Sequence, residues 1–219
     1  MTVLTPRFTQ AIEYARIAHA GRFRRGTRIP YLYHLLGVAS LVLEYGGSED
    51  QAIAALLHDV LEDCGDGHEA GIRAQFGDAV ANIVKDCTDG RDEASDGPQS
   101  DAEKFAAWVE RKLLYIAHLA IEDEDSLLVA ACDKLHNARA ILADLQGNTG
   151  PDVFDRFTAG RLGTLQYYEA LARALLERAD PSRPRFLELA REFDRTVARI
   201  HELAGAEERV PLGRDSMAA

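Results

Sequence analysis

The sequence predicts an all-α protein, a single globular domain of many helices that do not form a regular bundle. Apolar residues recur every three or four positions over most of the chain, which is the period of a helix with one buried face. The sequence lacks the sustained polar and apolar alternation that would indicate strands. With 219 residues and 47% hydrophobic content, the chain can bury one sizeable core. We therefore expect one domain over residues 1–204 and a flexible tail over residues 205–219.

The first two helices are placed by capping residues and by helix breakers. Thr5 followed by Pro6 is typical of a helix start, and the apolar spacing that follows predicts a helix from residue 6 to about residue 20. Glycines and a proline interrupt the pattern over residues 21–30, which predicts a loop. The second helix is expected to begin at or near His34.

The remaining helices follow from the same signals. The stretch Ser48–Gln51 has the form of a capping box, and it starts a helix that should include residues 58–63 and end at the glycines that follow. Residues 88–99 are polar, acidic and glycine-containing, and we expect a mobile loop there. Further helices are expected at about residues 69–75, 77–87, 102–119, 123–145, 151–178 and 183–203.

Composition excludes several classes of protein. A formal net charge of −11 argues against binding to nucleic acid or to an anionic membrane. The sequence has no secretory signal and no apolar run of membrane-spanning length. Its three cysteines have no paired spacing, which favours free thiols in the reducing cytoplasm. The oligomeric state stays open, and a homo-oligomer is compatible with this composition.

The most informative feature is a cluster of ionisable residues within an apolar segment. His58 and Asp59 are followed one helical turn later by Glu62 and Asp63, so a helix would place both acids above the His–Asp pair on one face. An imidazole beside several carboxylates suits a divalent metal ion, and the additional acids could position or deprotonate a water molecule. The alternative is that Glu62 and Asp63 only hold His58 or form a solvated helix end.

Two further positions could complete a metal site. Asp133 follows an almost entirely apolar run, so its carboxylate should face the interior, where an unpaired charge would be too costly. His34 is likewise polar in an apolar context, although by itself it would more simply be a capping or core histidine. Together with His58 and Asp59 they provide two imidazoles and two carboxylates, a set that suits Mn²⁺, Fe²⁺ or Zn²⁺.

Basic residues gather once in this acidic chain, and they suggest a binding site for phosphate. Four arginines, Arg22, Arg24, Arg25 and Arg28, fall within seven residues close to His34. Guanidinium groups bind phosphate oxygens bidentately, and Arg24 or Arg25 could instead stack on a base. An ordinary basic surface loop is the alternative. Lys112, Lys134 and Arg139 would extend the positive lining, and Arg161 and Tyr168 could close the pocket and stack a base.

The order of these motifs resembles that of the HD-domain hydrolases of the Rel/SpoT stringent-response enzymes and of the stand-alone small alarmone hydrolases. The resemblance covers roughly residues 8–145. The segments that carry the resemblance, in chain order, are Ala18–Gly21 with Arg24 and Arg25, Pro30 and Tyr31 with His34, Ala54–Asp63, Phe76–Val80, Glu110–Lys112 and Asp133–Asn137.

This resemblance implies a helical domain that uses Mn²⁺ to hydrolyse the 3′-pyrophosphate of a small-molecule nucleotide such as ppGpp. It implies a metal site of His34, His58, Asp59 and Asp133, with the pair Glu62 and Asp63 handling the water. It also implies substrate contacts by Arg24 and Arg25 with the nucleotide and its phosphates, by Lys112 with a phosphate, and by Asn137 with the ribose or base.

Some positions depart from the family pattern and leave alternatives open. Leu35 and Cys64 stand where the family usually has proline and threonine, and Arg25 replaces a common lysine. These changes leave the base preference open, including adenosine alarmones. Another HD phosphohydrolase, such as a nucleotidase or a phosphodiesterase, is the first alternative. A non-catalytic nucleotide sensor is the second, although the intact Glu62 and Asp63 argue against it.

Overall fold

The computed structural model describes residues 2–88, 100–213 and 216, and this part of the chain is helical. Its only extended pairing is an isolated antiparallel bridge between Phe23 and Pro30. The all-α prediction is therefore confirmed. None of the described helices is both long enough and apolar enough to cross a membrane. Apart from Thr88, the predicted loop over residues 88–99 lies outside the described residues.

The chain divides into two compact units, which are described separately below. The first comprises Met1–Asp89 and Glu122–His136, and the second comprises Gly90–Ile121 and Asn137–Ala219. One long helix, α8 (Glu124–Gln146), contributes its first part to one unit and its remainder to the other. The predicted boundary of a single domain at residue 204 stays a prediction.

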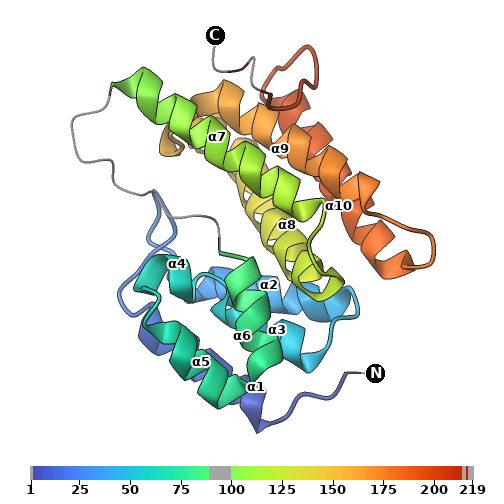
Figure 1. Cartoon of the computed structure of the whole chain (residues 1–219). Helices are drawn as coiled ribbons and strands as arrows, with labels where there is room; N and C mark the ends of the chain where they lie inside the picture. Colours follow the sequence, from blue (N-terminus) through green and yellow to red (C-terminus); the bar gives the residue numbers. More distant parts are fainter. Residues whose placement is uncertain (1, 89–99, 214–215, 217–219) are drawn as a thin grey trace. The chain divides into compact units, whose positions relative to one another are not determined.

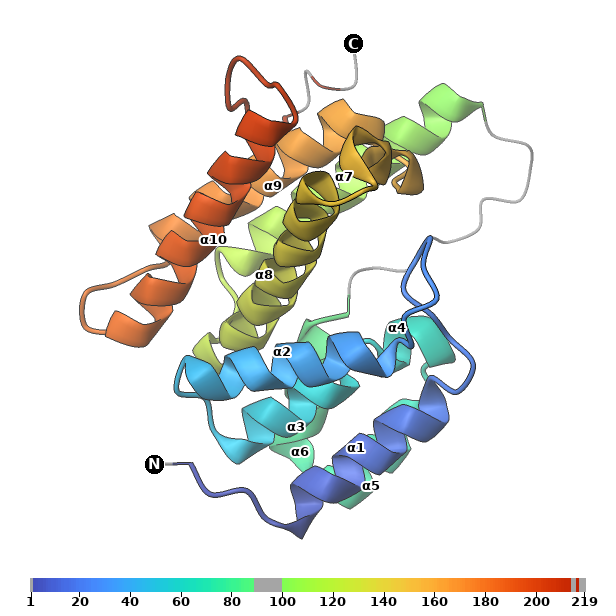
Figure 2. The ribbon, with the colours of Figure 1, turned by 180° about the vertical axis from the view of Figure 1, so that it is seen from behind.

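The first unit is built around a short buried helix. Residues 51–57 of α3 (Glu49–Leu57) are all buried, because this helix is apolar around most of its circumference. Helices on several sides cover it: α1, α2 and α6 each pack against α3 (Figures 1 and 2). The other helices of the unit are α1 (Pro6–Ala18), α2 (Leu32–Glu44), α4 (Val60–Cys64), α5 (His68–Phe76) and α6 (Asp78–Asp86).

Capping residues mark the starts of α1 and α3, but one predicted helix is broken. Ser48 and Gln51 form the expected capping box at the start of α3. The helix expected to include residues 58–63 instead stops at Leu57, and α4 starts only at Val60. Asp59 has a ψ of −4°, which interrupts the regular helix. The turn between α3 and α4 contains His58 and Asp59.

The second unit contains α7 (Asp101–Leu119), the remainder of α8, α9 (Gly160–Glu177) and α10 (Pro184–Leu203). The single helix predicted over residues 151–178 is wrong in one respect: it is divided into a 3₁₀ segment, Gly150–Arg156, and α9. Gly160 has a φ of +58°, a conformation that interrupts a helix and favours glycine. In the predicted tail, Leu212 is buried and its N–H donates to the Gln166 carbonyl at 2.9 Å.

Candidate metal centre

Four polar side chains converge inside the first unit. They come from three places in the fold: His34 from α2, His58 and Asp59 from the turn between α3 and α4, and Asp133 from α8. Nε2 of His34 is 3.1 Å from Oδ1 of Asp133, and Nε2 of His58 is 3.1 Å from Oδ2 of Asp59. The two remaining nitrogen–oxygen pairs are each 3.5 Å apart. The structure therefore brings together the four residues that the sequence suggested as ligands.

Burial and mutual proximity perturb these groups strongly. Burial lowers the pKa of His58, but the neighbouring Asp59 and Asp133 carboxylates more than offset it and raise that pKa well above its usual value. Burial likewise raises the pKa of Asp59, yet the His58 and His34 imidazoles bring it well below the usual range. The pKa of Asp133 is also well below its usual value, because Lys134 and the two imidazoles outweigh its burial.

The arrangement fits a divalent metal ion. Ligand atoms of His34, His58 and Asp59 lie within 4.8 Å of one another. Nε2 of His58 is buried and has no hydrogen-bond partner among the described atoms, so its position is suited to a metal bond. The other ring nitrogen, Nδ1, lies 2.8 Å from the Ala55 carbonyl oxygen. A ring held at Nδ1 in this way presents Nε2 as the ligand atom.

Tyr31 lies beside this cluster and connects it to the arginine loop, the segment 22–28 that contains the four arginines. Its hydroxyl donates to Oδ2 of Asp59 at 2.7 Å. Its ring stacks on His19 with 5.0 Å between centroids, and the Arg24 guanidinium lies 5.6 Å from the ring centroid. Burial, followed by the Asp59 charge, raises the pKa of Tyr31, so the phenol stays a proton donor to the carboxylate. Sequence reasoning had quoted Tyr31 only as part of a motif.

The arginine loop has a defined backbone conformation. The N–H of Arg24 donates to the Ile29 carbonyl at 2.9 Å, and the N–H of Tyr31 donates to the Arg22 carbonyl at 3.0 Å. These bonds form a narrow hairpin that turns at Gly26, whose φ is +72°. Arg24 is half-buried on the Tyr31 side, whereas Arg25 is exposed.

The two acids that follow the His–Asp pair have different surroundings. Oδ1 of Asp63 pairs with Nη1 of Arg22 at 3.1 Å, and Arg22 also donates to the Asp63 backbone carbonyl. Oδ2 of Asp63 is 3.5 Å from Nε2 of His19. Glu62 is exposed. The catalytic roles assigned to Glu62 and Asp63 stay predictions.

The remaining predicted contacts belong to the second unit. Nζ of Lys112 lies over the rings of Tyr115 and Tyr167, 5.9 and 5.2 Å from their centroids. Tyr168 is only 8% exposed, and Arg161 is exposed with Nη2 3.4 Å from the Gly205 carbonyl oxygen. Asn137 is half-buried on α8, one helical turn after Asp133. The substrate roles of Lys112, Asn137, Arg161 and Tyr168 stay predictions.

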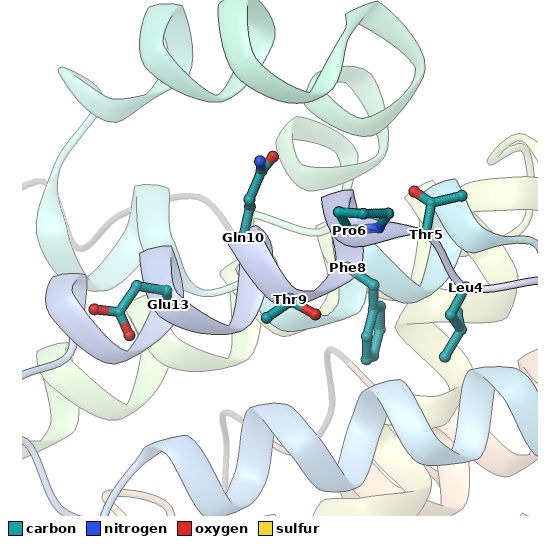
Figure 3. Close-up of a pocket in the computed structure, with 7 residues that line it drawn as sticks. All are labelled: Leu4, Thr5, Pro6, Phe8, Thr9, Gln10 and Glu13. Atoms are coloured by element: carbon teal, nitrogen blue, oxygen red, sulfur yellow. The ribbon is translucent and has the colours of Figure 1, made fainter.

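A surface hollow elsewhere in the first unit is separate from these residues. It lies along the start of α1, has a volume of about 700 Å³, and is open to solvent (Figure 3). None of the predicted site residues lines it. Its lining consists of Leu4, Thr5, Pro6, Phe8, Thr9, Gln10 and Glu13.

Comparison with known proteins identifies the class that this fold and His–Asp site define. The model of the HD domain family matches residues 11–165, and the chain therefore belongs to the HD-domain family. The Rel/SpoT-type resemblance inferred from the motifs is confirmed by similar proteins within that class.

Two curated relatives carry the resemblance. The chain is 35% identical over 133 residues to guanosine-3′,5′-bis(diphosphate) 3′-pyrophosphohydrolase MESH1 of Xenopus tropicalis, covering 59% of this chain and 66% of the frog protein. It is 30% identical over 170 residues to the bifunctional (p)ppGpp synthase/hydrolase SpoT of Escherichia coli K12, covering 77% of this chain and 22% of that protein. The match thus spans slightly less than two thirds of the first relative and a much smaller part of the second.

Solved structures show the same fold. A crystal structure of a Listeria monocytogenes protein matches with a TM-score of 0.60 and 28% identity, over 75% of this chain and 99% of that chain. A structure described as that of a metazoan SpoT ortholog that hydrolyzes ppGpp matches with a TM-score of 0.58 and 22% identity, over 94% of this chain and 99% of that chain.

Proposed function

We propose that the protein is a metal-dependent hydrolase of alarmone nucleotides. It cleaves the 3′-pyrophosphate of ppGpp, pppGpp or their adenosine analogues, releasing pyrophosphate and a nucleoside 5′-phosphate. The convergence of His34, His58, Asp59 and Asp133 carries this proposal. It gains weight because the chain belongs to the HD-domain family and is similar in sequence to curated relatives named as guanosine-3′,5′-bis(diphosphate) 3′-pyrophosphohydrolases.

The four converging residues would hold one divalent cation, for which we propose Mn²⁺. Two neutral imidazoles and two carboxylates leave coordination positions for water and a substrate oxygen. When bound, such a cation lowers the pKa of a water molecule and polarises a phosphoryl oxygen. The protein's part is to fix the His58 ring through the Ala55 carbonyl, so that Nε2 stays directed at the carboxylates.

Among the residues of the arginine loop, Arg24 is the best supported as a phosphate contact. The Tyr31 ring lies beneath its guanidinium, and the Tyr31 hydroxyl bonds to Asp59. This chain of contacts holds a permanent positive charge close to the ligand set, where a substrate phosphate would bind. Guanidinium groups bind phosphate oxygens bidentately, which suits Arg24 to this contact.

Glu62 and Asp63 are proposed to divide the proton transfers. The Arg22 contact fixes the position of the Asp63 side chain, which we propose orients the attacking water and accepts its proton. Exposed Glu62 is then the candidate that returns a proton to the leaving oxygen. In-line attack on the 3′-linked phosphate would give the products named above.

The partner of this site is a small-molecule nucleotide, and the reducing cytoplasm is the proposed location. The three cysteines, Cys64, Cys87 and Cys132, are free thiols in the structure, in agreement with that location.

A product assay tests the function. Purified protein with Mn²⁺, Fe²⁺ or Zn²⁺ is offered ppGpp, pppGpp, ppApp and ordinary nucleoside triphosphates, and pyrophosphate is resolved from orthophosphate. We expect pyrophosphate from the 3′-pyrophosphorylated nucleotides only, and none from an Asp133→Ala variant. Turnover of plain nucleotides alone would assign the protein to the broader HD phosphohydrolases, and no turnover with any metal would favour a nucleotide sensor.

A further inference from the structure

A third histidine lies behind the candidate metal centre. His136, on α8 in the first unit, is buried, and its Nδ1 lies 2.9 Å from Nδ1 of His34. The two ring centroids are 4.8 Å apart, with 63° between the ring planes. This contact is a hydrogen bond between two imidazole nitrogens, on the side of His34 opposite the Nε2 atom that faces Asp133.

Helix α2 is shaped to admit the His136 ring. Gly37 follows His34 by three residues, and a Cβ atom at Gly37 would overlap Nε2 of His136. The Tyr33 ring meets the His136 ring edge-on, with 5.3 Å between centroids. Because Gly37 has no side chain, the His136 ring can reach His34.

The proton in this pair decides whether His34 can bind a metal. An imidazole nitrogen that ligates a metal must present a lone pair, and a neutral ring then carries its proton on the other nitrogen. If Nε2 of His34 is the ligand atom, Nδ1 of His34 is the donor and Nδ1 of His136 is the acceptor. The reverse arrangement places the proton of His34 on Nε2 and blocks that ligand position.

We propose that His136 is a positioning residue that accepts the Nδ1 proton of His34 and so fixes its metal-binding tautomer and ring orientation. This inference deepens the proposed function and rests on its metal site, but it does not depend on the identity of the nucleotide. His58 has the corresponding support from a backbone carbonyl, which side-chain substitution cannot remove. His34 instead depends on a side chain, so its support can be tested by mutation.

The experiment compares two substitutions at this position in the full chain. His136→Leu removes the acceptor while keeping an apolar side chain, whereas His136→Asn places Oδ1 near the site of Nδ1 and restores an acceptor. Mn²⁺ affinity is measured by calorimetry without nucleotide, and the thermal midpoint of the metal-free protein is measured in parallel. His201→Leu is the matched control, because His201 is also buried but bonds to the Leu165 carbonyl in the second unit.

Removing the hydrogen-bond partner of a metal-ligating histidine typically weakens metal binding by about 10- to 100-fold. We expect His136→Leu to lower the Mn²⁺ affinity by this factor. His136→Asn should recover most of the affinity, and His201→Leu should bind Mn²⁺ as tightly as the wild type. Wild-type affinity in a folded His136→Leu variant would overturn the proposal. Equal loss in the Asn and Leu variants would also overturn it, since the acceptor would then be irrelevant.

Two further measurements keep the test decisive. If His136→Leu does not fold, Gly37→Ala displaces the His136 ring from the opposite side, and unchanged Mn²⁺ affinity in that variant would refute the inference. Because Zn²⁺ is diamagnetic, long-range proton–nitrogen spectra of the Zn²⁺-loaded wild type should show His34 protonated on Nδ1 and His136 on Nε2. Tight metal binding without alarmone turnover would refute the proposed function alone, whereas a wild type that binds no metal would refute both.

Discussion

Replacing Asp133 by asparagine isolates one carboxylate of the candidate metal centre with little change in shape. The side chain is 9% exposed, and its Oδ1 lies 3.1 Å from Nε2 of His34 and 3.5 Å from Nε2 of His58. Oδ2 is paired with Nζ of Lys134 at 2.9 Å. The substitution therefore removes a buried negative charge that faces three nitrogen atoms.

The structure sets the size of the expected effect on the metal-free protein. With an effective dielectric constant of about 20, unit charges at the 3.5 Å separation of His58 and Asp133 interact by about 5 kcal/mol. Removing one member of a buried pair costs about 3–5 kcal/mol net. Because Asp59 remains beside His58, we expect the free energy of unfolding at pH 6 to fall by about 3 kcal/mol, the lower end of that range.

The metal-bound protein gives a sharper readout. A ligand that binds only the folded state stabilises it by about 2.7 kcal/mol when present at one hundred times its dissociation constant. If Asp133→Asn weakens Mn²⁺ binding by about 100-fold, the same metal concentration stabilises the variant by only about 0.4 kcal/mol. Urea titrations with EDTA and then with Mn²⁺ measure both values.

Two results would refute this reasoning. If Mn²⁺ stabilises Asp133→Asn as strongly as the wild type, Asp133 is not a ligand. If the metal-free variant is as stable as the wild type at pH 6, the interactions of Asp133 with Lys134, His34 and His58 do not stabilise the folded protein. The exposed Glu124→Gln substitution on the same helix is a control for the loss of one negative charge.

The further predictions concern Glu62, His58 and Tyr168. Glu62→Gln should keep Mn²⁺ affinity but lower kcat by about 10², and an unchanged kcat would exclude proton transfer by Glu62. Because the pKa of His58 is raised, Mn²⁺ must displace a proton, so Mn²⁺ affinity measured by calorimetry should fall as the pH drops below that pKa. The same raised pKa stabilises the metal-free protein below about pH 6.5, the ordinary histidine value, and this contribution is lost as the pH rises through the folded-state pKa. Tyr168→Ala should cost about 3 kcal/mol or more of stability, because the buried ring packs against Phe193, whereas Tyr168→Phe should cost much less in urea titrations.

The residues of the candidate metal centre could be predicted from the sequence because each is a polar group in an apolar context. Asp133 ends a buried run on α8, and a buried carboxylate requires a compensating charge or a metal. The break between α3 and α4 was not predictable in the same way. Residues 58–63 have helical spacing throughout, and only the ψ of Asp59 in the folded chain shows that the helix is interrupted.

The contacts of His136 with His34 and of Tyr31 with Asp59 could not be predicted from the sequence, because they join residues far apart in the chain. Helical spacing places His136 on the same side of α8 as Asp133, which is a signal that could have drawn attention to it. It does not show that His34, 102 residues away, is the residue opposite. The hydrogen bond from Tyr31 to Asp59 was hidden for the same reason, because a periodic pattern defines a face and not its partner.

The strongly negative chain and the proposed polyanionic substrate are compatible because the relevant charges are local. At physiological salt, exposed charges more than about 8 Å apart are largely screened, so the net charge of −11 has little effect within the site. Two residues of the arginine loop make different contacts: Arg22 pairs with Asp63, while Arg24 lies over Tyr31. One arginine therefore pairs with the protein's own carboxylate, and we propose the other as a contact for the phosphates of a nucleotide.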